Sequence, residues 1–152
     1  MYIKDYLKQF KDKKIKLLVD MDGVIADYNF GCAKDYDKKR PLFDNIKKLK
    51  IVSKMLNVDL FIFSATRYNI GFEQKQWWLD KYAPFFKSEN RIIISREANN
   101  MEESALLKAK YLQDLKRDNS VIIVIDDDPK NLKAIHKLND DVILLKDTVL
   151  ID

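Results

Sequence analysis

Short apolar runs alternate with longer amphipathic stretches along most of the chain. The runs hold four to six residues rich in Val, Ile, Leu and Phe, which predicts strands that are buried on both faces. These strands are expected at 15–20, 58–63, 91–95, 121–125 and 142–145. Between them, apolar residues recur every three or four positions, which is the spacing of helices. The helices are expected at 2–11, 41–56, 72–82, 104–116 and 131–138.

A regular alternation of strands and helices is typical of an α/β fold with a mainly parallel sheet and helices on both faces. We therefore predict a three-layer, Rossmann-like architecture in which ligands bind at the carboxyl ends of the strands. No repeat, low-complexity segment or break in composition divides the 152 residues. The chain is expected to form a single domain over 1–152, with an amphipathic helix within 1–14.

The composition, with 47% hydrophobic and 34% charged residues, is that of a soluble protein. No apolar run approaches the roughly 20 residues of a membrane-spanning helix, and the N-terminus lacks the apolar core of a signal peptide. One cysteine, Cys32, excludes an intrachain disulfide and favours the cytoplasm. Because the only histidine, His136, lies far along the chain, Cys32 is interpreted as a structural thiol. The net charge of +4 suits an anionic substrate and permits contact with nucleic acid.

Polar residues that carry chemistry follow three of the predicted strands. Asp20 and Asp22 follow the first strand, Ser64 the second, and the acidic triplet 126–128 the fourth. The carboxyl ends of parallel strands share one edge of a sheet, so we expect these groups to converge. Acids two positions apart in an extended chain point the same way and repel each other. A divalent cation would offset that repulsion, and Mg²⁺ prefers such oxygen ligands.

The segment 19–27, V-D-M-D-G-V-I-A-D, resembles the first signature of the haloacid dehalogenase-like phosphatases. It is closest to the D-M-D-G-V-L-A-D form of the 5'(3')-deoxyribonucleotidases. The resemblance implies that Asp20 is the nucleophile that accepts the phosphoryl group and that Asp22 is the acid/base. It also implies a Mg²⁺ held by Asp20, Asp127 and the backbone carbonyl of Asp22, with Asp126 as a close supporting acid.

The other motifs of that family have counterparts here. Ser64 matches the second motif, in which its hydroxyl and the backbone N–H groups of Ala65 and Thr66 would hold phosphate oxygens. Alone, such a serine more often ends a strand or caps a helix.

For the lysine of the third motif, the sequence offers Lys108 and Lys110, and the K-x-x-Y-L pattern favours Lys108. At least one of the two is expected to be an ordinary surface lysine. V-I-D-D-D-P-K-N-L resembles the fourth motif, with Asp127 as the metal ligand and Asp128 as a helix cap.

The cap region departs from the nucleotidase pattern. Only 41 residues separate Asp22 from Ser64, so 23–40 can form at most a short cap or flap in place of a helical insertion. The phosphatase domains of polynucleotide kinase-phosphatases are similarly short there and carry S-x-R after the second strand, compared with S-A-T-R here. Arg67 is therefore a candidate for gripping a second phosphate or a sugar, although a salt bridge is equally compatible. The lysines of 34–40 are expected to attract nucleic-acid ends.

These features predict a Mg²⁺-dependent phosphomonoester hydrolase that forms an aspartyl-phosphate and acts on nucleotides. One alternative is a 3'-phosphatase on DNA or RNA ends, and another is a non-catalytic phosphate-binding or regulatory module. Of Trp77 and Trp78, one is expected in the core at helical spacing, and stacking on a base is the less favoured role. The expected partner is a small phosphorylated molecule, not a membrane, and the sequence sets no oligomeric state.

Overall fold

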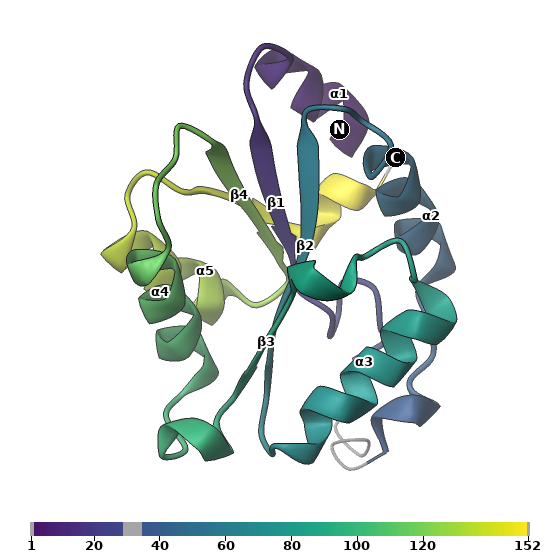
Figure 1. Ribbon diagram of the computed structural model, residues 1–152, viewed down its shortest axis with the longest axis vertical. Coiled ribbons are helices and arrows are strands. Elements are labelled where there is room, and N and C mark those ends of the chain that lie inside the picture. Colours follow the sequence, from purple (N-terminus) through teal and green to yellow (C-terminus); the bar gives the residue numbers. More distant parts are fainter. Residues whose placement is uncertain (1, 29–34, 152) are drawn as a thin grey trace.

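In the computed structural model, which describes residues 2–28 and 35–151, five strands form one sheet in which all neighbours are parallel (Figure 1). The strand order is β3-β2-β1-β4-β5. The strands are β1 (Ile15–Val19), β2 (Val58–Thr66), β3 (Arg91–Ser95), β4 (Val121–Asp126) and β5 (Ile143–Lys146). The predicted α/β fold is confirmed, including the parallel sheet that alternating strands and helices indicated.

Helices cover both faces of this sheet. They are α1 (Ile3–Leu7), α2 (Phe43–Val52), α3 (Ile70–Tyr82), α4 (Ser104–Asp114) and α5 (Pro129–Leu138). Figure 1 shows α4 and α5 side by side on one face, and α1, α2 and α3 on the other. Successive side chains of a strand point to opposite faces. Accordingly, Leu17 of β1 packs in the core under α1 to α3, whereas Leu18 packs in the core under α4 and α5.

The boundaries differ from the expected ones where pairing and capping extend or shorten an element. β2 continues to Thr66 because β3 pairs with it from Ile62 to Thr66, so Ser64 lies within the strand instead of after it. α5 begins at Pro129, two residues early, because the Asp128 side chain accepts a hydrogen bond from the Lys130 N–H at 2.9 Å. The N-terminal helix is confirmed, but its last turn, Lys8–Phe10, is a 3-10 helix.

The segment that follows Asp22 turns back on itself before it enters α2. Isolated bridges join Asp22 to Ala26 and Ala26 to Pro41, and a 3-10 turn covers Tyr36–Lys38. Trp78 of α3 donates a hydrogen bond from Nε1 to the carbonyl of Lys39 at 3.0 Å and is completely buried. Cys32 and Lys34 lie outside the described residues, so the expectations for them stay predictions.

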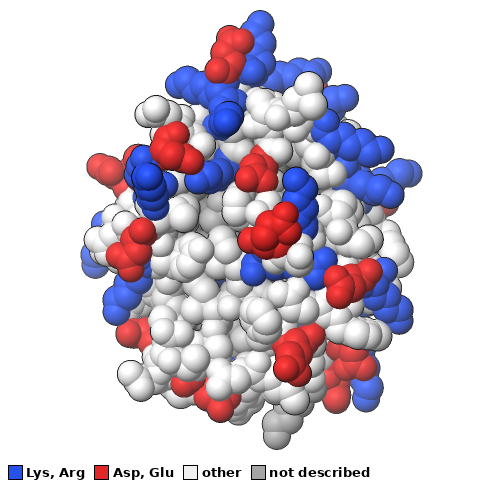
Figure 2. All heavy atoms as spheres, viewed as in Figure 1, with Lys and Arg blue, Asp and Glu red and all other residues white. Residues whose placement is uncertain are grey.

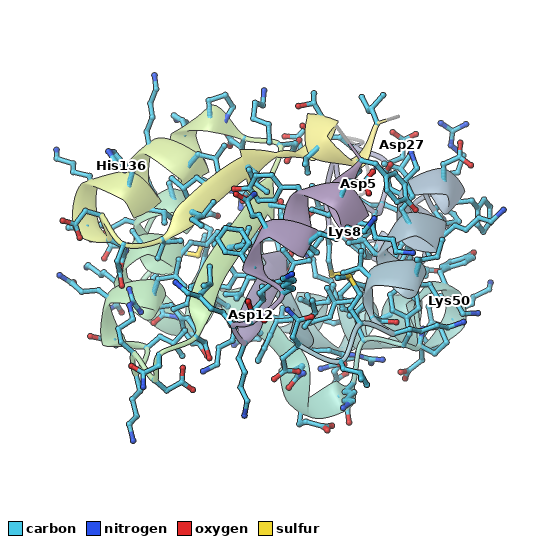
Figure 3. The ribbon with its side chains drawn as sticks, turned by 90° about the horizontal axis from the view of Figure 1, so that it is seen from above. Asp5, Lys8, Asp12, Asp27, Lys50 and His136 are labelled. Carbon is cyan, nitrogen blue, oxygen red and sulfur yellow. The ribbon has the colours of Figure 1, made fainter. Side chains whose placement is uncertain are left out.

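Charge is distributed unevenly over the surface. Figure 2 shows lysine and arginine gathered toward the end of the molecule where α1 lies. Figure 3 places Lys8 and Asp5 together on α1, where they form an ion pair of 2.9 Å, and His136 at the outer side of α5. Within the described residues, no helix has the length and hydropathy needed to cross a membrane.

Candidate active site

A cleft of about 400 Å³ opens at the carboxyl edge of the sheet, between the ends of β1, β2 and β4. Open α/β sheets bind ligands at this edge, next to the point where the strand order reverses. The strand register sets the location, since Val19 of β1 pairs with Ile125 of β4 and Asp20 therefore lies beside Asp126. The cleft is lined by Asp20, Asp22, Tyr28, Ala65, Ser104, Lys108, Asp127, Asp128, Pro129 and Asn131.

Three aspartates at this edge form one acidic group. One carboxylate oxygen from each of Asp20, Asp126 and Asp127 lies within 4.8 Å of the other two. Asp20 is 7% exposed and Asp126 is fully buried. Burial raises the pKa of Asp20 to about 7, although the neighbouring charge of Lys108 opposes this effect. Buried carboxylates this close repel each other, and only cations can keep all of them ionised.

Lys108 of α4 supplies one of these cations. Its ammonium group lies 3.1 Å from Asp20 Oδ1 and 2.7 Å from Asp126 Oδ2, and its side chain is almost completely buried. Burial lowers the pKa of Lys108, but the charges of Asp20 and Asp126 outweigh it and hold that pKa above its ordinary value. Lys110, the other sequence candidate, forms an exposed ion pair with Glu102 at 3.2 Å.

Asp126 and Asp127 have different surroundings although they are adjacent. Besides Lys108, Asp126 accepts hydrogen bonds from the backbone N–H of Asp128 and from the side-chain amide of Asn131, at 2.9 to 3.2 Å. Asp127 faces the cleft and, among residues 2–28 and 35–151, has no ion-pair partner. Burial, followed by the charge of Asp126, raises the pKa of Asp127 to about 6. Asp128 caps α5, as its place before Pro129 predicted.

Gly23 permits the close approach of the first motif to Asp127. Its φ angle is +78°, a backbone conformation that residues other than glycine rarely adopt. A Cβ atom at this position would lie 2.0 Å from Asp127 Oδ2. The D-M-D-G sequence thus needs its glycine here both for the turn and for the space that the Asp127 carboxylate occupies.

The Asp22 side chain lies apart from the acidic group and is held by two lysines. Lys39 Nζ lies 2.6 Å from Asp22 Oδ1, and Lys75 Nζ lies 3.2 Å from Asp22 Oδ2. Burial alone would raise the pKa of Asp22, but the charges of Lys75 and Lys39 prevail and lower it to about 2. Tyr36, 4% exposed, also packs here, and burial together with the Asp22 charge raises its pKa well above the usual value.

The sequence did not indicate that either lysine pairs with Asp22, and Lys39 was expected only among the lysines that attract nucleic-acid ends. Lys39 lies in a stretch of charged residues that is typical of a solvated loop. Lys75 carried a weak signal, because Trp78 and Leu79 follow it by three and four positions and helical residues at that spacing share a face. Trp78 and Leu79 are fully buried, and Lys75 on the same face is buried with them, at 2% exposure.

The predicted phosphate-binding residues are only partly brought together. Ser64 is fully buried and its Oγ accepts a hydrogen bond from Lys75 at 2.7 Å, while Ala65 lines the cleft. The Thr66 hydroxyl donates to the carbonyl of Tyr68 at 3.4 Å, and the exposed Arg67 guanidinium lies 5.5 Å from the Tyr68 ring centroid. Thr66 and Arg67 side chains are therefore not among the described groups that line the cleft.

The two tryptophans occupy different environments. Trp78 is in the core, as expected for one of the pair, and stacks edge-on against Tyr36 with centroids 6.1 Å apart. Trp77 is 49% exposed and borders a separate hollow next to Ile70, with the Lys81 ammonium 5.0 Å from its ring. Neither ring lines the cleft, so the geometry lends no support to base stacking by them.

No protein-family model matches this sequence, and no curated protein matches it significantly. Structural likeness is clear, however. Two similar solved chains come from "Structure of the Pnkp1/Rnl/Hen1 RNA repair complex" and "Structure of Pnkp1/Rnl/Hen1 complex". They are 16% and 14% identical to this chain, and each has a TM-score of 0.68. The match covers 89% and 88% of this chain but only 42% and 46% of those chains.

A third similar chain, from the structure of DsGPDH of Dunaliella salina, has a TM-score of 0.53 at 15% identity, over 91% of this chain and 24% of that one. This chain thus spans less than half the length of each of these solved chains. At such low identity the likeness establishes the fold alone, which is that of domains found within larger proteins, including a component of an RNA repair complex.

Proposed function

We propose that this chain is a Mg²⁺-dependent phosphomonoester hydrolase of the haloacid dehalogenase-like type, acting through an aspartyl-phosphate on Asp20. The observation that carries the proposal is the group formed by Asp20, Asp126 and Asp127 with Lys108 beside it, at the carboxyl edge of a parallel sheet. A structural ion-pair network would match its charges. The group at this edge instead leaves Asp127 without a cation among the described residues, and the Asp127 carboxylate faces an open cleft.

The donor set fits Mg²⁺. Hard oxygen ligands from one or two carboxylates, together with a substrate phosphate, are its usual partners in phosphoryl-transfer sites. Asp20 and Asp127 would supply the carboxylates, and the backbone carbonyl of Asp22 would supply a further oxygen. Asp126 would be a close supporting acid. When bound, the ion would offset the negative charge of the acidic group and of the incoming phosphate.

In the proposed reaction, Asp20 attacks phosphorus in line, the P–O bond to the alcohol breaks, and an aspartyl-phosphate forms. Lys108, 3.1 Å from Asp20 Oδ1, favours the ionised form of that carboxylate and stabilises the equatorial phosphate oxygens. Asp22 is the proposed acid/base: in its protonated form it delivers a proton to the leaving oxygen, and as a carboxylate it takes one from the water that hydrolyses the intermediate. Because Lys75 and Lys39 favour the carboxylate, Asp22 has to gain that first proton when the substrate binds. Ser64 and the N–H groups of Ala65 and Thr66 hold the phosphate.

Nucleotides are the first proposed substrate class, following the resemblance of the D-M-D-G-V-I-A-D signature. The second candidate, a 3'-phosphatase on DNA or RNA ends, is favoured by the shortness of 23–40 and by the fold likeness to a chain of an RNA repair complex. An open site admits a polymer end, whereas a closing lid would exclude it.

A phosphate-release screen tests these proposals. Purified protein is incubated with nucleoside 5'- and 3'-monophosphates and with 3'-phosphorylated oligonucleotides, each with Mg²⁺ and with EDTA. We expect Mg²⁺-dependent release from at least one class. Release from the oligonucleotides alone selects the end-processing function, and release from neither class in the presence of Mg²⁺ contradicts the hydrolase proposal and favours a non-catalytic module.

A further inference from the structure

Lys75 of α3 makes three contacts that join the ends of two strands. Its ammonium group donates to Ser64 Oγ at 2.7 Å, to the carbonyl of Ala65 at 2.8 Å and to Asp22 Oδ2 at 3.2 Å. An ammonium group has three N–H donors, so these acceptors use all of them. Lys75 is therefore fully engaged by the protein, and we infer no direct contact between Lys75 and a substrate.

A buried ammonium group is expensive to desolvate, and an apolar residue of similar volume in its place is often neutral or stabilising. Stability therefore gives little reason for a lysine at a position that is 2% exposed. What a methionine could not provide is the set of three directed hydrogen bonds. They fix Ser64 and Ala65 of β2 relative to Asp22, which follows β1.

The contact also sets the direction of the Ser64 hydroxyl. Because an ammonium group only donates, Ser64 Oγ must accept from Lys75, and its own proton is left for another acceptor. Among the described residues, Ser64 Oγ has no hydrogen bond other than the one from Lys75. Ala65, the next residue, lines the cleft. Lys75 thereby prepares Ser64 as a donor, which is the role that a phosphate oxygen requires.

Asp22 is oriented from both sides by cations. Lys75 binds Oδ2 and Lys39 binds Oδ1, so neither oxygen of the carboxylate is free to rotate away. The Tyr36 ring packs between them, 5.0 Å from Lys75 Nζ and 4.8 Å from Lys39 Nζ. Lys39 comes from the short segment before α2, while Lys75 comes from α3, which packs on the sheet.

We propose that Lys75 is a positioning residue that holds Ser64 as a hydrogen-bond donor toward the substrate phosphate and Asp22 toward the leaving oxygen. The inference rests on the proposed hydrolase function. It assigns Lys75 two effects of different kinds, one on the binding of phosphate through Ser64 and one on the departure of the alcohol through Asp22. These effects can be separated by the choice of substrate.

The test compares wild type with Lys75→Met on two substrates. One is p-nitrophenyl phosphate, whose leaving group needs little protonation, and the other is whichever nucleotide or oligonucleotide releases phosphate in the screen. The value of kcat/KM covers the steps up to loss of the alcohol, and the inhibition constant of inorganic phosphate reports phosphate binding. Lys81→Met is the matched control, since Lys81 is exposed on the same helix.

For Lys75→Met we expect kcat/KM on the nucleotide or oligonucleotide to fall about 100-fold or more. General-acid catalysis and one hydrogen-bond donor each contribute at this level. The loss on p-nitrophenyl phosphate should be at least about tenfold smaller, since only the phosphate contact is affected. Phosphate should inhibit more weakly. Lys81→Met should behave as wild type. In an Asp22→Asn background, Lys75→Met should lower kcat/KM on the nucleotide or oligonucleotide only by about the factor that it loses on p-nitrophenyl phosphate, because the contact with Ser64 is still lost.

Three results would overturn the inference. The first is wild-type kinetics for Lys75→Met. The second is an equal loss on both substrates that parallels a lower melting temperature, which would mean a structural role alone. If Lys75→Met does not fold, Lys75→Gln takes its place, and failure of both to fold has the same meaning. An inactive wild type would instead reject the proposed function itself, and the inference with it.

Discussion

Asp126 and Asp127 are neighbours in the sequence, yet their partners differ. Asp126 is buried against Lys108 and Asn131, whereas Asp127 faces the cleft without an ion pair among the described residues. Removing one partner of a buried ion pair leaves the other charge uncompensated, while removing an unpaired carboxylate relieves repulsion. At the scale of residues, the two acids should therefore separate stability from metal binding.

Asp127→Asn is expected to raise the Mg²⁺ concentration needed for half-maximal activity, with little loss of stability. Asp126→Asn should destabilise the protein by about 3–5 kcal/mol, because Lys108 loses a buried partner. Asp128→Asn should cost at most about 1 kcal/mol, the worth of a cap. Mg²⁺ titrations and urea unfolding of the three variants measure both quantities. A metal requirement shifted most by Asp128→Asn would contradict this ranking.

The acidic group also predicts a dependence on pH. In metal-free protein, burial raises the pKa of Asp20 to about 7 and of Asp127 to about 6, from 3.8 for an ordinary aspartate. Between the ordinary value of 3.8 and about 7, the folded state therefore binds more protons than the unfolded state. The free energy of unfolding consequently falls as pH rises through that window. Mg²⁺ binds the ionised carboxylates, so its stabilising effect should grow over the same range.

Melting temperatures in EDTA and in Mg²⁺, at about pH 5.5 and about pH 7.5, test this expectation. The increase caused by Mg²⁺ should be larger at the higher pH and should shrink in Asp127→Asn. An increase that is equal at both pH values would mean that the acidic group does not bind the ion.

Residues with chemistry at strand ends were predictable, because parallel strands bring those ends to one edge whatever their separation in sequence. Asp20, Asp22 and Asp127 all line the cleft, and Lys108, which the third motif indicated, joins them from the helix α4. Lys39 and Lys75 were not predictable as site residues, because their roles depend on tertiary packing that brings two lysines onto one carboxylate. Arg67 shows the reverse case, since its motif suggested a grip on substrate while its side chain is exposed beside Tyr68.

At the scale of elements, α3 does more than cover the sheet. Through Trp78 Nε1, it holds the carbonyl of Lys39 at 3.0 Å, and through Lys75 it reaches Ser64 and Asp22. The sequence predicted this helix from its apolar spacing but placed its start two residues late, at Phe72. The contacts to the short segment before α2 could not be inferred, because that segment has no periodic pattern of its own.

Trp78→Phe is expected to lower the free energy of unfolding by about 1–3 kcal/mol, because the buried carbonyl of Lys39 loses its donor. It should also reduce phosphatase activity, since Lys39 then holds Asp22 less firmly. Trp77→Phe on the exposed side of the same helix is the matched control and should stay within about 0.5 kcal/mol of wild type. Denaturant unfolding and kcat for both variants give the comparison, and equal effects would show that the Trp78 hydrogen bond does not position the segment.

At the scale of the whole molecule, basic charge also gathers away from the segment 34–40, whose lysines were expected to attract nucleic-acid ends. Two described cations of the segment before α2 pair with aspartates, Lys39 with Asp22 and Arg40 with Asp27 at 3.2 Å. By contrast, residues 1–16 and 43–54 hold ten lysines and three aspartates, on and around α1 and α2. Exposed ammonium groups there form the basic end of the molecule seen in Figure 2.

If polynucleotide ends are the substrates, their KM should rise with salt concentration, because each phosphate that contacts a lysine releases bound counterions. For single strands the logarithm of affinity falls by about 0.7 per contact for each tenfold increase in salt. Mononucleotides should show a much smaller dependence. Steady-state kinetics at several salt concentrations, with a 3'-phosphorylated oligonucleotide and a nucleoside 3'-monophosphate, provide the measurement. Equal salt dependence for the two would exclude an extended contact with the strand.

The role of Asp20 as nucleophile is tested most directly by Mg²⁺-dependent phosphate release from Asp20→Asn compared with wild type. Asn has the same shape but is a far weaker nucleophile, so turnover should fall to background in a protein that is still folded. Asp12→Asn, at an exposed position near α1, is the control and should keep full activity. A purified, folded Asp20→Asn protein that releases phosphate at near the wild-type rate would contradict the aspartyl-phosphate mechanism.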